Sequence, residues 1–349
     1  MNIFESTFEK HKKLVLESRN GLIGEEASLT PAEIKQYKIK FGQMLKKDLG
    51  SFVKELQSAI TDPKVQAFLM AAKEDGATDD DVIRIQQNEV PVLSLIPTQN
   101  EVFLEKSLNW PFNKQPENIV SYIRDAKGSM LPIIVSGNYV IDGHHRWSQI
   151  FCLNPKGVIP VYNITFEGKS DPTTILKKIH LGIAATRKEL PTTGGQSTDT
   201  DLFKVAQDGF AKWIHANLDN NEAALKSFKI VEAEMKSKLQ EADDAAAGNN
   251  VQFVSNVIIP YLWKNVLLIK QRPGEYERAI MPQTEKGGDG KLDTFINTMK
   301  SGNINVDPMT ETLFELSVIS PVVKVFPENF GASLRSDSFI KTADPFPET

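Results

Sequence analysis

The sequence contains a single cysteine, Cys152, so no disulfide can form within the chain and a zinc site built from cysteines is excluded. It contains no apolar run close to the roughly 18 residues that span a bilayer. Its first residues mix charged with apolar positions, unlike a secretory signal peptide. A basic excess is also missing, because 40 Lys and Arg stand against 45 Asp and Glu. These absences predict a cytoplasmic protein outside membranes, for which a nucleic-acid partner is not favoured.

The composition is that of a folded protein. The chain of 349 residues is 40% hydrophobic and 24% charged, which is typical of globular domains, and it is long enough to bury a substantial core. Changes in pattern along the chain predict an α+β fold, in which a small mixed-sheet domain is flanked by mainly helical regions. The expected parts are a helical N-terminal region 1–87, the sheet domain 88–190, a helical C-terminal region 191–330 and a poorly ordered tail 331–349.

The expected sheet domain is less acidic than the regions around it. Residues 88–190 contain eleven Lys and Arg against nine Asp and Glu, a balance of +2, whereas the whole chain carries −5. The flanking regions together therefore carry −7, since −5 minus +2 is −7. This difference favours an anionic ligand in the central domain.

Capping residues and apolar spacing predict helices in the N-terminal region. Thr30 to Glu33 matches a capping box with proline at the first helical position, and apolar residues three and four apart continue this helix to about Ile60. Asp62-Pro63 predicts a new, shorter helix. The acidic residues Asp79 to Asp81 predict the start of another helix, which ends before Asn88.

After Pro172 the chain shows helical periodicity again. Two histidines on its predicted helices, His180 and His215, are interpreted as partly buried packing residues rather than metal ligands. The last long apolar segment contains Pro260 and Lys264 and is interpreted as a core helix rather than a membrane span. The predicted helices cover residues 174–185, 201–218, 220–247, 251–269 and 292–299.

In the central domain the order of elements predicts a compact α/β unit. A strand-like run "VPVLSLI" begins at Val90, and a helix follows from Asn118 to Ala126. The run "LPIIV" predicts a buried strand, Gly137-Asn138 a hairpin turn and "YVI" the returning strand. A helix then begins within "HRWSQIFCL", and "VIPVYNI" predicts the closing strand.

The segment "VIDGHHRW", from Val140 to Trp147, carries the chemistry of this unit. A helix that begins here points its unpaired amide groups and its positive dipole end at the preceding turn, which attracts phosphate. Gly143 permits close approach of the backbone, Arg146 supplies a fork of donors, and His144 and His145 can donate hydrogen bonds or exchange protons. Asp142 beside an anion indicates either a Mg²⁺ ion or the orientation of a histidine. The alternative interpretation is a polar turn that only caps the helix.

Residues Glu89 to Thr165 resemble the N-terminal domain of the ParB/sulfiredoxin superfamily. The resemblance rests on the strand that ends at "LIP", the helix before a glycine, the "LPIIV" strand, the "DGHHR" motif and the closing "IPV" strand. Sulfiredoxins carry a catalytic cysteine where this chain has His144, so sulfinic-acid reduction is not expected. Chromosome-partitioning members continue into a helix-turn-helix domain, which residues 174–220 do not resemble. The motif is most similar to the branch of free-serine kinases and ParB-like ATPase/nuclease proteins.

The chemistry of the motif and the resemblance together predict roles for individual residues. Gly143, His144, His145 and Arg146 would hold nucleotide phosphates, and Asp142 would hold Mg²⁺ that accompanies ATP, ADP or CTP. His145 and Glu101 would be catalytic, with Glu101 in "LIPTQNEVFLEK" as the base and Glu105 as its alternative.

Three functions remain open from the sequence. The first is a nucleotide-binding enzyme that transfers the terminal phosphate to water or to a small hydroxyl substrate. The second is a ParB-like nuclease or DNA-binding effector, which the acidic charge disfavours. The third is a non-catalytic protein that retains the fold and binds a protein partner through its helical flanks.

Overall fold

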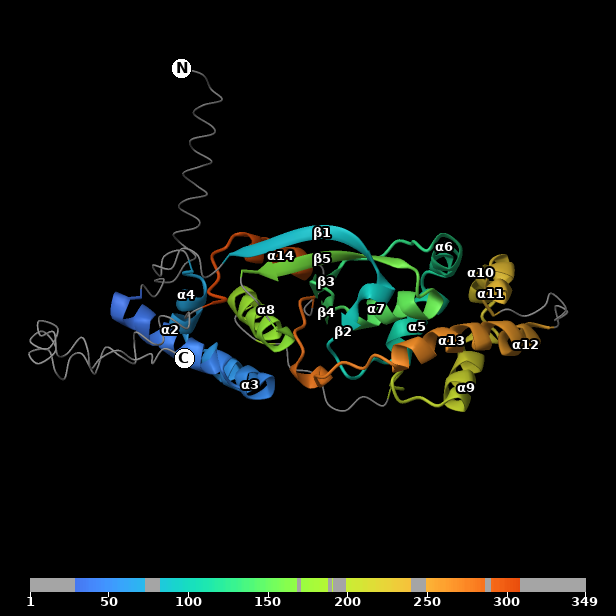
Figure 1. The fold of residues 1–349 in the computed structure, drawn as a ribbon, viewed down its shortest axis with the longest axis horizontal. Helices are drawn as coiled ribbons and strands as arrows, with labels where there is room; N and C mark the ends of the chain where they lie inside the picture. The colour runs from blue at the N-terminus through green and yellow to red at the C-terminus, as the bar shows by residue number, and fades with distance from the viewer. Residues whose placement is uncertain are drawn as a thin grey trace, which may run out of the picture.

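The computed structural model describes residues 29–72, 82–167, 171–187, 190, 199–239, 249–285 and 290–307. A five-stranded mixed sheet lies between two groups of helices (Figure 1), which confirms the expected α+β class. The predicted tail 331–349 lies outside the described residues. Within the described ranges, no helix combines the length and the apolar character needed to cross a membrane.

The sheet has the strand order β1-β5-β3-β4-β2. The strands are β1 (Ile83–Pro91), β2 (Ile96–Pro97), β3 (Ile133–Ser136), β4 (Tyr139–Asp142) and β5 (Val158–Phe166). β1 pairs antiparallel with β5, β5 parallel with β3, and β4 parallel with β2. β3 and β4 form the predicted antiparallel hairpin, and Gly137 in its turn has a φ of 58°.

The beginning of the sheet differs from the prediction. The helix expected to end before Asn88 is wrong, because Ile83–Pro91 is a strand that pairs along its whole length with β5. Ile83 and Ile85 are half-buried and alternate with exposed residues, as in a strand with one face toward the core. This strand forms by pairing with β5, which the local sequence does not reveal. The run from Val90 is also not one strand, since a 3₁₀ turn at Val92–Ser94 separates β1 from β2.

The predicted helix from Thr30 to Ile60 is divided into α2 (Pro31–Leu45) and α3 (Leu49–Ala59). The Thr30–Glu33 capping box is present at its start. Asp48 interrupts the helix because its side chain accepts a hydrogen bond from the amide of Ser51 and caps α3. The restart after Asp62 is confirmed as α4 (Pro63–Leu69).

The remaining helices surround the sheet. In chain order they are α5 (Leu104–Asn113), α6 (Glu117–Asp125), α7 (His144–Leu153), α8 (Pro172–Arg187), α9 (Gln207–Leu218), α10 (Glu222–Ile230), α11 (Glu232–Leu239), α12 (Asn250–Phe253), α13 (Ile259–Lys270) and α14 (Lys291–Lys300). A π-helical turn at Val254–Ile258 joins α12 to α13, and the 3₁₀ turn η3 (Arg278–Ile280) precedes the segment that reaches the site.

Two predicted C-terminal helices differ from the structure. The helix expected over 220–247 breaks at Val231, which is buried and has non-helical backbone angles, so α10 and α11 are separate. The helix expected from Asp201 begins only at Gln207 as α9. Asp201 instead accepts hydrogen bonds from the amides of Val102 and Phe203, which holds its segment against the start of α5.

Two hydrophobic cores lie on opposite faces of the sheet. Ile133 and Val135 of β3 pack in one core with α5–α7 and α9–α13, whereas Ile134 between them packs in the other with α2–α4, α8 and α14. Alternate side chains of a strand point to opposite faces, which explains this division. Trp147 anchors α7 in the first core, where it is fully buried and its indole N–H donates to the Val92 carbonyl at 3.0 Å.

Candidate functional site

The candidate site lies where β4 ends and α7 begins. As the motif predicts, Asp142 ends the strand, Gly143 is the N-cap and His144 is the first helical residue. Gly143 has a φ of 95°, and a Cβ atom on it would lie 2.4 Å from Cγ2 of Ile133. Glycine is therefore required here both by the left-handed backbone and by the close approach of β3.

The N-terminus of α7 has free donors. The amides of Arg146 and Trp147 donate to the Gly143 carbonyl at 2.9 and 3.0 Å, and the Gly143 amide donates to Oδ1 of Asp142 at 2.8 Å. For the amides of His144 and His145 we find no acceptor in the described part of the chain. The positive end of the helix dipole adds to these donors, so this turn attracts an anion.

A cavity of about 350 Å³ opens beside this helix start. One side is the motif itself, and the other is formed by η3 and the segment that follows it, with Gln99 from the loop after β2. The lining residues are Gln99, Asp142, Gly143, His144, His145, Arg146, Arg278, Met281, Pro282, Gln283 and Glu285.

His144 belongs to the wall of the site. Its Nε2 accepts hydrogen bonds from the amides of Thr98 and Gln99, each at 3.2 Å, so this nitrogen ties α7 to the loop after β2. The side chain is buried, and burial lowers its pKa to about 3. His144 is therefore a neutral positioning residue, and the nitrogen that meets these amides is not available to donate to a phosphate.

His145 is held in a similar way. Its Nε2 accepts from the amide of Phe103 at 3.2 Å, and the two rings stack with centroids 5.8 Å apart. Burial lowers the pKa of His145 to about 3, with further lowering from His144, Arg278 and Lys106. A neutral imidazole that accepts at Nε2 carries its proton on Nδ1, so His145 can act as a hydrogen-bond donor.

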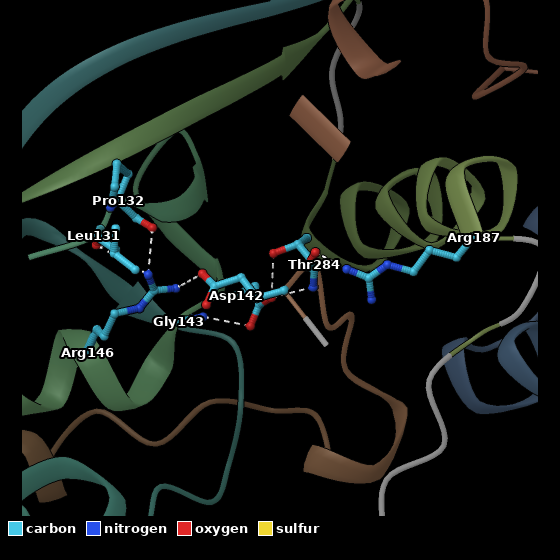
Figure 2. Close-up of polar contacts among 8 residues, drawn as sticks. Leu131, Pro132, Asp142, Gly143, Arg146, Arg187 and Thr284 are labelled. Atoms are coloured by element: carbon cyan, nitrogen blue, oxygen red, sulfur yellow. Dashed lines mark hydrogen bonds and ion pairs between the residues drawn. The ribbon is translucent and has the colours of Figure 1, made fainter. Parts of the chain in front are cut away.

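Arg146 has its guanidinium fixed across the cavity. Nη1 donates to the carbonyls of Pro132 and Leu131, at 2.9 and 3.3 Å (Figure 2). Nη2 donates to the carboxylate of Glu285, in a partly buried ion pair. One edge of the guanidinium is thus anchored to the backbone while the other faces an anion, as expected for an arginine that binds phosphate or carboxylate.

Asp142 is engaged on both carboxylate oxygens. Oδ2 accepts from the amide and from the hydroxyl of Thr284, both at 2.6 Å, while Oδ1 accepts from Gly143 (Figure 2). Among the residues that the structure describes, no three His, Cys, Asp or Glu side chains gather in a group that could hold a metal ion. Asp142 therefore does not fit a magnesium site held by the protein alone, and its observed contact is with the segment across the cavity.

The expected bases lie elsewhere. Glu101 sits in the connection between β2 and α5 and is not among the residues that line the cavity. Glu105, the alternative, accepts a hydrogen bond from the amide of Thr200 at 2.8 Å and so holds a neighbouring loop. The structure brings together Asp142 and the three residues that follow Gly143 at the cavity, and neither glutamate is among the residues that line it.

Arg278 and Glu285 belong to the cavity although the sequence analysis did not select them. The guanidinium carbon of Arg278 lies 5.2 Å from the ring centre of Phe103, and no carboxylate pairs with Arg278 among the described residues. Both follow the motif by more than a hundred positions: Arg278 begins the 3₁₀ turn η3, and Glu285 lies in the irregular segment after it. Only the fold brings them to α7, so no local sequence signal identifies them.

Other candidate residues have structural roles. Burial raises the pKa of the Cys152 thiol, which is fully buried, so it is not a reactive thiolate. His180 is buried beside the Ile280 carbonyl, at 2.8 Å, and His215 pairs with Asp219 on its own helix. Both observations agree with their interpretation as packing residues.

Comparison of the chain with protein-family models, with curated proteins and with solved structures finds no match. The resemblance to the ParB/sulfiredoxin superfamily therefore stays a prediction from the motif.

Proposed function

We propose that the cavity at the start of α7 binds the phosphate groups of a nucleotide. The observation that carries the proposal is the convergence of two kinds of donor. The free amides of His144 and His145 and the guanidinium groups of Arg146 and Arg278 meet at one cavity, at the positive end of a helix.

The arrangement suits a phosphate better than a neutral group. The carbonyls of Leu131 and Pro132 fix Arg146, so its Nη2 is presented to the cavity with little loss of side-chain freedom. Arg278 stacks on Phe103 and brings a second positive charge without a carboxylate partner in the described residues. The proton that we place on Nδ1 of His145 adds a neutral donor. A phosphate has enough acceptor oxygens for all of them.

Phosphate transfer or hydrolysis is the enzymatic form of this proposal. It requires a group that positions or deprotonates the attacking hydroxyl. The carboxylates at the cavity are Asp142 and Glu285, rather than the expected Glu101. Both oxygens of Asp142 already accept hydrogen bonds from the protein, so Asp142 is poorly placed to act as this group. We therefore propose nucleotide binding as the function, and the experiment below also measures nucleotide hydrolysis.

Isothermal titration with ATP, ADP and CTP, each with and without Mg²⁺, tests binding, and phosphate release tests turnover. Arg146→Ala should weaken binding about 10- to 100-fold, because charge-assisted hydrogen bonds contribute about 1.5–3 kcal/mol. Arg278→Ala should weaken it less, since the contact that holds Arg278 within the described residues is with the ring of Phe103. Arg84→Ala is the matched control, as this exposed arginine on β1 does not line the cavity. Absence of binding to every nucleotide would refute the proposal.

A further inference from the structure

The segment Gln283–Glu285 is held firmly across the cavity. Thr284 is fully buried, and both its amide and its hydroxyl donate to Oδ2 of Asp142. From the other side, Arg187 donates to the carbonyl of Gln283 at 2.6 Å. It also donates to the carbonyl of Thr284 (Figure 2). Asp142 at the end of β4 and Arg187 at the end of α8 therefore hold the backbone of Thr284 from two sides.

These contacts place the Glu285 carboxylate where an anionic ligand of Arg146 would bind. Its carboxylate accepts from Nη2 of Arg146, the edge of the guanidinium that is not anchored to the backbone. Glu285 lines the same cavity as the start of α7. A phosphate that used Arg146 would need the same donor, so the phosphate and the carboxylate cannot both pair with it fully.

Glu285 lies in a partly buried position at the cavity. Burial raises the pKa of this carboxyl, and the neighbouring Asp142 raises it further, while Arg146 acts in the opposite direction. The side chain is still 39% exposed, against 20% for Arg146, so the carboxylate can leave without opening the core. Thr284 keeps its contacts when only the Glu285 side chain rotates.

We propose that Glu285 is an intramolecular stand-in for the ligand phosphate, and that its pairing with Arg146 sets the affinity of the site. This inference rests on the proposed function. The nucleotide must displace the carboxylate, so the apparent dissociation constant equals the intrinsic one divided by the fraction of molecules in which Arg146 is free. Removing the negative charge of Glu285 increases that fraction.

The test compares wild type with Glu285→Gln by titration with ATP and with sodium pyrophosphate. Glu285→Gln should bind at least about 10-fold more tightly, because a charge-assisted hydrogen bond no longer competes. Glu285→Asp, which keeps the charge but shortens the reach, should fall between the two. Glu277→Gln is the matched control, since this exposed glutamate precedes η3 and does not line the cavity. Arg146→Ala in the Glu285→Gln background should remove the gain.

The outcomes separate this inference from the proposed function. Equal affinities of wild type and Glu285→Gln would overturn the role of Glu285 and leave nucleotide binding intact. Unchanged affinity with loss of phosphate release would also overturn it, because Glu285 would then act as a catalytic base. Absence of binding by both proteins would overturn the proposed function and the inference with it.

Discussion

Substitution of Gly143 by alanine gives the sharpest test of how the motif is built. The φ of 95° places this residue in a region that L-residues enter at a cost of about 1–2 kcal/mol. The added Cβ would also lie 2.4 Å from Cγ2 and 2.7 Å from Cβ of Ile133, whose side chain is fully buried. Overpacking of this kind costs about 1–3 kcal/mol. Gly143→Ala should therefore lower the free energy of unfolding by about 2–5 kcal/mol.

Gly137→Ala separates the two contributions. Gly137 has a φ of 58°, also left-handed, but nothing lies within 4 Å of an added Cβ. This variant should lose only the backbone contribution of about 1–2 kcal/mol. Urea unfolding of wild type and both variants, followed by fluorescence, gives the free energy of unfolding of each protein. The difference between the losses of Gly143→Ala and Gly137→Ala is the cost of the contact with Ile133.

Equal losses for Gly143→Ala and Gly137→Ala would refute the reasoning, because β3 would then not restrict the backbone at the motif. A large loss only at Gly143 would show that the close approach of β3 demands glycine independently of any ligand. Nucleotide titration of a folded Gly143→Ala protein should also show weaker binding, since the displaced turn moves the amides of His144 and His145.

Further predictions concern buried charge. Burial lowers the pKa of His144 and His145 to about 3 and that of His180 to about 4, from 6.5, so the unfolded chain binds more protons below pH 6.5. As the pH is lowered from 6.5 to 4, the free energy of unfolding should fall, by about 2 kcal/mol per histidine at pH 5. Urea unfolding at pH 7.5 and at pH 5.0 measures this difference, and equal free energies at the two pH values would contradict the prediction. Lys178→Ala should cost about 3 kcal/mol, because Lys178 is nearly buried in its ion pair with Asp307. Lys178→Met with Asp307→Leu should recover part of that loss in the same assay.

Local signals predicted the elements around the motif correctly. The hairpin at Gly137 and the start of α7 after Gly143 follow from turn and capping preferences, which act over a few residues. The helix before the hairpin was also predicted within a residue or two, as α6. Each of these elements is decided by nearby side chains and backbone angles.

Some elements that depend on distant partners were predicted wrongly. The part of β1 before Asn88 was expected to be helical from the acidic residues Asp79 to Asp81, whereas its pairing partner β5 lies far along the chain. The break at Val231 was missed because no proline or glycine marks it, and Val231 itself is a buried apolar residue. The same limit applies to the site, where Arg278 and Glu285 reach α7 only through the fold.

The sequence by itself determined that a helix begins after Gly143, with Asp142 before it and Arg146 in its first turn, because capping and backbone freedom are local properties. Only the tertiary structure decided what these groups face. In the folded protein Nε2 of His144 accepts from the loop after β2, Thr284 donates to Asp142, and Glu285 pairs with Arg146. Side-chain contacts across more than a hundred residues depend on how both cores pack against the sheet, and no short stretch of sequence encodes that packing.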